Sequence, residues 1–367
     1  MVSAQVQKRV LLLSVGYGQG HHAAAAALAE TYVKSGWEAR VVDVCSMAHP
    51  FAFRLSQRFY QFCVRRMPWL WGVTYSLTDT ANWAELVRLP FMRGIVRCLA
   101  HLLHEWRPDF VFWTYPRFAY MLDALLKQGG YSVPYAVVVT DALEISRPWM
   151  LTSAHMVFVT DEESRRRVVE RYGLLDETVH ATGFPVRQAF QVGAGYSGGE
   201  FRVLYGAFRS THAVRSDIQA LLETFPDLSM TVVAGTRSEC LQRMFREFVD
   251  SGQLTVLKET NQMAEMMRSH HLYVGKAGAA TMFECYSTGL PMLVNFALPG
   301  QEQGNLELLL ADGAGGYVGT SSQLVETVRS LLMNEGAGLR ALRENMLRAA
   351  RSGGVSRIIN LVNTHFS

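Results

Sequence analysis

Long apolar runs and paired cysteines are missing from this 367-residue sequence. No uninterrupted apolar run approaches the roughly 20 residues that a membrane-spanning helix needs, and the N-terminus shows no signal pattern. The five cysteines have no Cys-x-x-Cys spacing and leave an odd one over. We therefore expect a protein that does not span a membrane and that works in a reducing, cytosolic setting.

A strong charge bias is missing as well. The formal net charge is +3 and the pI is near 8.6. Nucleic-acid binders usually show a much stronger basic bias, so we expect no nucleic-acid partner. Apolar residues make up 49% of the chain, which is enough for two domains of ordinary size, each with its own core.

Buried strands alternate with helical sequence in the first half of the chain. The glycine loop 16–22 follows the first strand and opens an alanine run, and Asp141 lies just past a strand end, where open α/β sheets place ligands. Such alternation predicts a parallel sheet with helices on both faces. The predicted strands are residues 9–15, 38–44, 109–114, 134–141 and 155–160.

The same pattern restarts after the glycine-rich stretch 193–199, which is the natural domain boundary. The predicted strands there are 201–205, 230–234 and 254–257, with helices over 214–224 and 238–250. The fold class is therefore α/β, with two doubly wound, Rossmann-like domains at 1–192 and 200–367.

The densest chemistry lies between residues 272 and 305. Small residues after the strand end 272–274 let the backbone turn into a helix near Ala279, whose free N–H groups would face a diphosphate. Glu284, more than a turn further on, can accept hydrogen bonds from both ribose hydroxyls. Amide and carboxylate groups that suit a sugar follow the next strand, at Gln301, Glu302, Gln303 and Asn305. We interpret the stretch as a nucleotide-sugar site; the alternative is an ordinary strand–helix turn with a capped second helix.

Residues 51–107 interleave aromatic residues with arginine and contain no lysine. Rings at the headgroup level and guanidinium groups on lipid phosphates are what an interfacial helix needs. We therefore predict a helical insertion that contacts an anionic membrane surface. The alternative is a helical hairpin that packs on the first domain with its arginines in water.

The glycine loop 16–22 leaves a second function open. Gly16, Gly18 and Gly20 alternate, so no clean Gly-x-Gly-x-x-Gly dinucleotide motif is present. Asp43, which closes the second strand, nevertheless keeps a dinucleotide site as an alternative.

The block 276–305 resembles the donor site of the diacylglycerol glycosyltransferases, which include bacterial processive glucosyltransferases and plant monogalactosyldiacylglycerol synthases. It is more distantly similar to the lipid-linked muramyl GlcNAc transferase of peptidoglycan synthesis. The family block reads approximately Lys-Pro-Gly-Gly-x-Thr-x-x-Glu, then Pro-Gly-Gln-Glu-x-Gly-Asn. Ala277 and Ala279 depart from it, and Ala279 replaces a glycine that lets a phosphate approach closely. The matching positions are Lys276, Gly278, Thr281, Glu284, Pro299, Gly300, Gln301, Glu302, Gly304 and Asn305.

Other segments carry the same resemblance. Gly18-Gln19-Gly20-His21 is similar to the family's Gly-x-Gly-His loop, which implies that His21 is the general base; an imidazole suits that role, although a helix-capping role is the alternative. Residues 183–187 and 68–75 also resemble family segments, the latter at the lipid-docking region. Thr140-Asp141 and Trp149 match, but Ser146 stands where the family has a histidine.

The second domain shows two further likenesses. Gly206 remains of a family glycine pair that contacts the donor, with Ala207 in place of the second glycine. Met263 lies in a segment similar to the Asn-Met stretch beside the uracil, although a methionine-rich helix is otherwise core. Arg209 could meet a phosphate in a bidentate manner, but we expect a plain surface residue.

The resemblance implies a GT-B glycosyltransferase with its site in the interdomain cleft and with its last helix, near 355–362, bracing the first domain. The implied reaction is inverting transfer of a hexose from a UDP-hexose to diacylglycerol, at the cytoplasmic face of the membrane, by a peripheral protein. No Asp-x-Asp motif occurs, so we expect no metal site, and no cofactor is expected beyond the donor. The oligomeric state and the hexose are not predicted.

The implied roles fall into three groups. His21 and Asp141 are catalytic. The implied membrane or acceptor residues are Arg65, Arg66, Trp69, Trp71, Tyr75 and Trp149. The implied donor residues are Gly20, Gly206, Met263, Lys276, Gly278, Ala279, Thr281, Glu284, Gln301, Glu302 and Asn305. Two alternatives stay open: a UDP-sugar 2-epimerase, and a UDP-binding membrane protein that has lost or altered catalysis.

Overall fold

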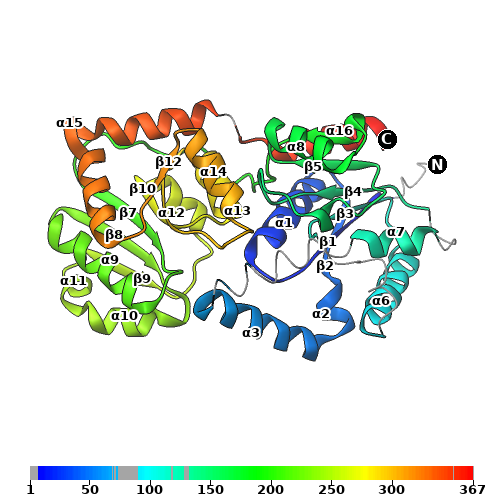
Figure 1. The fold of residues 1–367 in the computed structure, drawn as a ribbon, viewed down its shortest axis with the longest axis horizontal. Helices are drawn as coiled ribbons and strands as arrows, with labels where there is room; N and C mark the ends of the chain where they lie inside the picture. Colours follow the sequence, from blue (N-terminus) through cyan, green and yellow to red (C-terminus); the bar gives the residue numbers. More distant parts are fainter. Residues whose placement is uncertain are drawn as a thin grey trace, which may run out of the picture. The chain divides into compact units, whose positions relative to one another are not determined.

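The computed structural model describes residues 7–67, 69, 72, 90–116, 119–127, 132–349 and 351–366. The chain forms two compact units: unit 1 contains residues 1–187 and 352–367, and unit 2 contains residues 188–351 (Figure 1). The predicted domains, 1–192 and 200–367, differ from these units at both ends of the second domain. Residues 352–367 belong to unit 1 because their apolar side chains are buried in its core.

Unit 1 contains a six-stranded sheet in the order β2-β1-β3-β4-β5-β6, and every pair is parallel. Its inner strands β3, β4 and β5 are apolar throughout, and β1 is apolar between its two ends, as expected for strands that helices cover on both faces. The parallel α/β prediction is confirmed, with most strands shorter than expected. The strands are β1 (Arg9–Ser14), β2 (Glu38–Asp43), β3 (Phe110–Trp113), β4 (Tyr135–Val138), β5 (Met156–Val159) and β6 (Val179–Ala181).

Two cores lie on the two faces of this sheet. Alternate strand residues such as Val10 and Leu12 pack against α1 and α16, and their neighbours Leu11 and Leu13 share a core with α6 and α7. Figure 1 shows α16, in red, among the elements of unit 1. The helices are α1 (Gln19–Lys34), α2 (Val44–Ala48), α3 (Pro50–Arg66), α6 (Pro90–Trp106), α7 (Ala119–Lys127), α8 (Glu162–Tyr172) and α16 (Gly354–Phe366).

Unit 2 contains a second parallel sheet of six strands, in the order β12-β11-β10-β7-β8-β9. The chain starts at β7 and reaches its neighbour β10 only after passing through β8 and β9, so the strand order reverses between β7 and β10. The carboxyl ends of strands at such a switch point are the usual ligand site in open α/β sheets. The strands are β7 (Phe201–Gly206), β8 (Leu228–Val233), β9 (Leu254–Leu257), β10 (Leu272–Lys276), β11 (Met292–Phe296) and β12 (Gly315–Tyr317).

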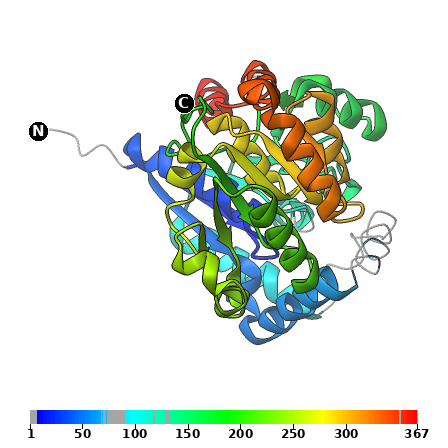
Figure 2. The same cartoon turned by 90° about the vertical axis from the view of Figure 1, so that its left-hand side faces the viewer.

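Helices cover both faces of the second sheet, and α9 packs beside α15 (Figures 1 and 2). The predicted helix 238–250 is divided at Phe245, whose backbone is not helical. The helices are α9 (Thr211–Thr224), α10 (Ser238–Met244), α11 (Arg246–Asp250), α12 (Met263–Ser269), α13 (Ala279–Thr288), α14 (Gln303–Ala311) and α15 (Ser321–Arg348), the last with a non-helical break at 333–336.

Candidate functional site

The loop between β10 and α13 is the predicted diphosphate site. Gly278 is the N-cap of α13 and provides no side-chain hydrogen bond, so the first-turn N–H groups of Ala279 to Thr281 receive no side-chain cap. The loop turns tightly, and the Gly278 N–H donates to the carbonyl of Lys276 at 2.8 Å. A Cβ atom on Gly278 would lie 2.9 Å from Lys276 Nζ. Glycine at 278 therefore lets the lysine side chain fold back over the start of the helix.

Lys276 is ion-paired with Glu302. The Glu302 side chain is buried, and its second oxygen accepts a hydrogen bond from the Leu298 N–H at 3.0 Å. The ammonium also lies 5.5 Å from the centre of the Phe208 ring. Glu302 therefore holds both Lys276 and the loop before α14. This structural role of Glu302 was not predicted from the sequence.

Asn305 joins the two loops at this edge of the sheet. Its buried side-chain amide donates to the carbonyl of Ala277 at 3.0 Å. The predicted donor residues Lys276, Gly278, Glu302 and Asn305 are thus brought together. Gln301 lies in the same loop as Glu302, half-buried, and Glu284 lies half-buried within α13.

The end of β7 lies beside this loop. A Cβ atom on Gly206 would clash with the Tyr273 hydroxyl and would lie 2.8 Å from the Phe208 ring, which explains the glycine in steric terms. Ala207, the departure from the family pair, is buried. Met263 is the first residue of α12 and is half-buried.

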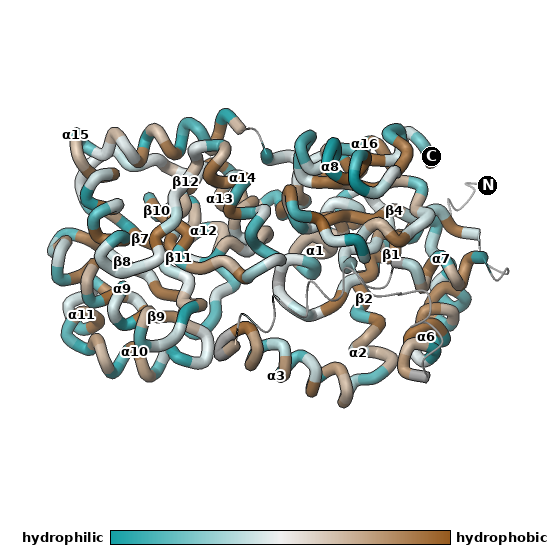
Figure 3. The backbone as a smooth tube through the Cα atoms, viewed as in Figure 1, coloured by the Kyte–Doolittle hydropathy of each residue, from teal (hydrophilic) through white to brown (hydrophobic). Residues whose placement is uncertain are grey.

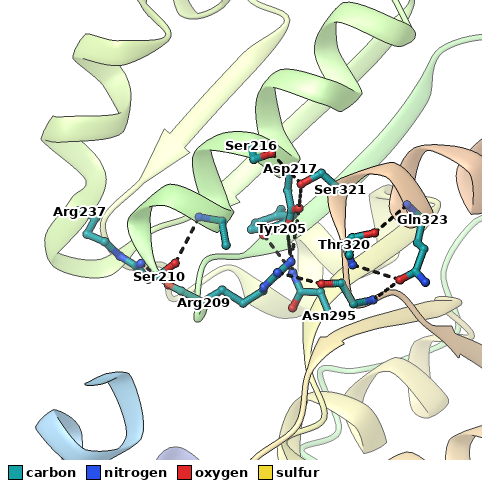
Figure 4. Close-up of polar contacts among 12 residues, drawn as sticks. Tyr205, Arg209, Ser210, Ser216, Asp217, Arg237, Asn295, Thr320, Ser321 and Gln323 are labelled. Carbon is teal, nitrogen blue, oxygen red and sulfur yellow. Dashed lines mark hydrogen bonds and ion pairs between the residues drawn. The ribbon is translucent and has the colours of Figure 1, made fainter. Parts of the chain in front are cut away.

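Arg209 is not a plain surface residue, so that expectation was wrong. Its guanidinium lies 3.1 Å from the carboxylate of Asp217, which is 0% exposed, and it donates to the Gly319 carbonyl at 3.0 Å. Figure 4 shows further donors around the same carboxylate. They are the Tyr205 hydroxyl at 2.6 Å, the Ser321 hydroxyl at 2.6 Å and the Asn295 amide at 3.4 Å.

This Asp217 network was missed in the sequence, although a signal for it exists. Val214, Ile218 and Leu221 form the buried stripe of α9, and Asp217 stands on that stripe in an apolar position. An acid there requires donors from other elements. Burial and the neighbouring carboxylate raise the pKa of the Tyr205 phenol well above its usual value, so Tyr205 is the proton donor in this pair.

In unit 1 the predicted base, His21, is buried in the first turn of α1. Its Nδ1 lies 2.9 Å from the Thr140 hydroxyl, and its carbonyl accepts from the Thr114 hydroxyl at 3.0 Å. The Tyr115 ring meets the imidazole edge to face at 5.0 Å. The ring is therefore held from several sides. Gly18, the N-cap, has a φ of 136°, which requires glycine, and Gly20 follows within the helix.

Trp149, expected among the membrane or acceptor residues, is fully buried, so its ring does not face a membrane. Its indole N–H donates to Asp141 at 2.7 Å, and its ring centre lies 5.9 Å from that of His21. Ser146, in place of the family's histidine, is buried at the start of the short 3-10 turn Arg147–Trp149. The geometry makes Trp149 a support for Asp141 and for the base.

Asp43 is occupied in holding the first glycine loop. One carboxylate oxygen accepts from the Gly16 N–H at 2.9 Å and the other from the Ser46 N–H at 2.9 Å. A Cβ atom on Gly16 would meet the side chains of Gln57 and Asp43. The structure therefore gives Asp43 the role of holding this loop and the start of α2.

The predicted membrane segment is described in part. Helix α3 exposes four large apolar side chains, 55–76% accessible, and carries no acid; in Figure 3 brown and teal residues alternate along it. Arg65 and Arg66 end this helix, and Trp69 is 63% exposed. Trp71 and Tyr75 lie outside the described residues. The exposed apolar residues of α3 are Phe51, Leu55, Phe59 and Phe62.

Within the ranges given above, no helix is long and apolar enough to cross a bilayer. The same ranges contain no group of three or more His, Cys, Asp or Glu side chains placed to hold a metal ion.

Two protein families match the sequence, one in each unit. The model for monogalactosyldiacylglycerol (MGDG) synthase matches residues 21–186, and that for the glycosyltransferase family 28 C-terminal domain matches residues 209–351. A processive diacylglycerol beta-glucosyltransferase of Bacillus cytotoxicus is 24% identical, covering 96% of this chain and 93% of that protein. The chloroplastic MGDG synthase of Spinacia oleracea is also 24% identical, covering 98% of this chain and 73% of that protein.

Solved structures share the fold. MurG of Acinetobacter baumannii has a TM-score of 0.61 at 15% identity, covering 97% of this chain and 99% of that one. The UDP-GlcNAc 2-epimerase of Neisseria meningitidis has a TM-score of 0.58 at 13% identity, covering 97% and 100%.

The two Rossmann-like units and the matched families define the protein as a two-domain glycosyltransferase of the GT-B class. Within that class the chain resembles the MGDG synthases and the diacylglycerol glucosyltransferases, with which it aligns over nearly its whole length.

Proposed function

We propose that the protein transfers a hexose from a UDP-hexose to diacylglycerol or a related membrane lipid, with inversion at the anomeric carbon. The names of the relatives support the lipid acceptor, and the glycosyltransferase family match in unit 2 supports the donor. The observation that carries the proposal is the buried His21 imidazole, whose Nδ1 is engaged by Thr140. Nε2 is then the nitrogen that takes a proton from the acceptor.

The proposed reaction is a single displacement. His21 takes the proton of the lipid hydroxyl as its oxygen attacks the anomeric carbon, and the bond to UDP breaks on the opposite face. An α-linked donor then gives a β-linked glycolipid. Asp141 directly follows Thr140 in the chain and is held by the Trp149 indole, and in this proposal it assists the base.

The negative charge of the departing UDP needs compensation. The N-terminal turn of α13 offers backbone N–H groups and the positive end of the helix dipole. Lys276 adds a positive charge that is partly balanced by Glu302. Backbone donors are therefore the main stabilising groups in this proposal.

We place the protein at the cytoplasmic face of a membrane, as a peripheral protein. Helix α3 combines exposed Phe and Leu side chains with exposed Arg54 and Arg58 and no acid, which suits a bilayer with anionic lipids. The 2-epimerase and the inactive binding protein are not favoured, because the matching families and the relatives named above are transferases and synthases.

The test is a transfer assay with purified protein on vesicles that contain diacylglycerol and anionic lipid. UDP-glucose, UDP-galactose and UDP-GlcNAc are offered separately, and glycolipid is detected by mass spectrometry. We expect product from one donor, a β linkage by NMR, and loss of product with His21→Ala. An α-linked product would overturn the inverting mechanism, and 2-epimerisation of UDP-GlcNAc without glycolipid would favour the isomerase.

A further inference from the structure

Phe208 is a half-exposed aromatic residue at the switch point of unit 2. It lies in the loop between β7 and α9, and its side chain is 46% exposed. Its ring packs over Gly206, and the ammonium of Lys276 lies 5.5 Å from the ring centre. The Phe208 ring therefore lies beside Lys276, the last residue of β10 before the loop that precedes α13.

The backbone on both sides of Phe208 is held in place. Arg237 donates to the carbonyls of Ala207 and Arg209, the residues directly before and after it. Arg209 in turn is anchored on the buried Asp217 and on the Gly319 carbonyl (Figure 4). The Phe208 N–H also donates to the Gly206 carbonyl at 3.0 Å. The loop is fixed, and the side chain at its centre is presented to solvent.

A rigid loop that exposes an aromatic ring indicates a functional role, because ordering these groups costs free energy. A buried ion pair loses most of its Coulombic gain to desolvation, so its presence does not by itself explain stability. Ligand sites, in contrast, combine an aromatic surface with a few fixed polar groups. Phe208, Lys276 and Glu302 are such a combination, and Lys276 contacts both of the others.

We propose that Phe208 is a binding residue for the hexose of the donor, with its ring against the apolar C–H face of the sugar. This inference rests on the proposed function, which supplies the UDP-hexose. The N-terminus of α13 takes the diphosphate, and Glu284, further along that helix, takes the ribose. Phe208 lies beside Lys276, which is ion-paired with Glu302, one of the residues interpreted from the sequence as suited to a sugar.

The test measures binding by calorimetry without acceptor lipid. UDP and the UDP-hexose that the wild type binds most tightly are titrated into wild type and Phe208→Ala. We expect the affinity for the UDP-hexose to fall about five- to twenty-fold, a loss typical of one aromatic contact. The affinity for UDP should stay within about two-fold.

Two further variants complete the test. Phe208→Tyr keeps a ring and should keep the hexose affinity, and Met244→Ala, a similarly exposed residue on α10, should change neither affinity. An equal loss for UDP and UDP-hexose would overturn the assignment to the sugar, as would no loss for either. Retained UDP binding shows that the Phe208→Ala unit is folded.

Failure of this inference is distinguishable from failure of the proposed function. A wild type that binds UDP-hexose with the expected Phe208 dependence but makes no glycolipid sinks the transfer proposal and supports the hexose contact. If the wild type makes glycolipid but Phe208→Ala binds the donor normally, the transfer proposal is supported and the hexose contact is overturned. A wild type that binds no UDP-hexose overturns both.

Discussion

The hydroxyl of Thr140 lies 2.9 Å from Nδ1 of His21, and both groups are buried. This contact engages one ring nitrogen and orients the imidazole, so it connects the end of β4 to the chemistry at the start of α1. The sequence analysis gave Thr140 no role of its own. The structure makes it a positioning residue for the proposed base.

Thr140→Val should therefore lower the rate of glycolipid formation by on the order of ten-fold, because Nδ1 loses its partner and the ring its orientation. Thr140→Ser, which keeps the hydroxyl, should retain most of the rate. The measurement is kcat on diacylglycerol vesicles across pH 6 to 9. A positioning role changes kcat and its pH profile, whereas equal rates and profiles for the valine and serine variants would contradict it.

Trp149→Phe should destabilise unit 1, because the buried carboxylate of Asp141 loses the indole N–H at 2.7 Å. The expected loss is about 1–3 kcal/mol in the free energy of unfolding. Urea unfolding measures it. If the indole instead contacted lipid, the variant would keep its stability and lose vesicle binding.

Asp217→Ala should be among the most destabilising substitutions in unit 2. It leaves Arg209, Tyr205 and Ser321 without their common acceptor, at an expected cost of about 3–5 kcal/mol in unfolding free energy. Asp227→Ala, at an exposed loop position, is the matched control and should change stability by less than about 0.5 kcal/mol. Equal unfolding midpoints for the two variants would show that the network contributes little.

His271 should make stability depend on mildly acidic pH. Its Nδ1 accepts the Arg202 N–H at 3.0 Å, and burial, the largest cause, lowers its pKa from 6.5 to about 4. Between these values the unfolded chain binds a proton that the folded chain does not, so stability falls as pH drops from about 6.5 to 4. The contribution is at most about 3 kcal/mol.

His271→Asn isolates this effect, since the asparagine oxygen can accept the same N–H and does not titrate. Denaturation midpoints of wild type and variant are compared at pH 7 and 4.5. We expect a smaller loss for the variant. Parallel losses would assign the acid sensitivity to other groups.

Phe59→Asp should weaken membrane binding. Phe59 is one of the exposed apolar residues of α3, and losing its burial in the interface should reduce partition to anionic vesicles by on the order of ten-fold. Val33→Asp removes a similarly exposed apolar residue on α1 and should leave partition unchanged. Cosedimentation with vesicles measures both. Equal partition of the two variants would mean that α3 does not face the bilayer.

Much of the fold follows from local sequence. Apolar runs such as 9–15 and 155–160 predicted parallel strands because strands covered on both faces carry apolar residues throughout. The start of α13 at Ala279 was predicted correctly from the small residues that precede it. Helix 238–250 was predicted as continuous because its composition gives no sign of the non-helical backbone at Phe245.

The partners of the buried polar side chains could not be predicted from the sequence. Arg209 and Asp217 are eight positions apart, but Gly319 and Ser321, which bond to them, lie 110 and 104 positions further along the chain. Trp149 was placed among the membrane or acceptor residues because its segment resembles that of the family. The sequence did not show that its indole is buried and donates to Asp141.

The return of α16 to unit 1 has a consequence for how the protein is made. Val355, Ile358 and Val362 share a core with strand residues of β1 and β3, so the part of this sheet face that α16 covers stays open until the whole of unit 2 has been synthesised. The emerging chain must carry that uncovered apolar surface through translation, when chaperones and aggregation compete for it. Premature termination before residue 354 would therefore damage the half of the protein that was made first.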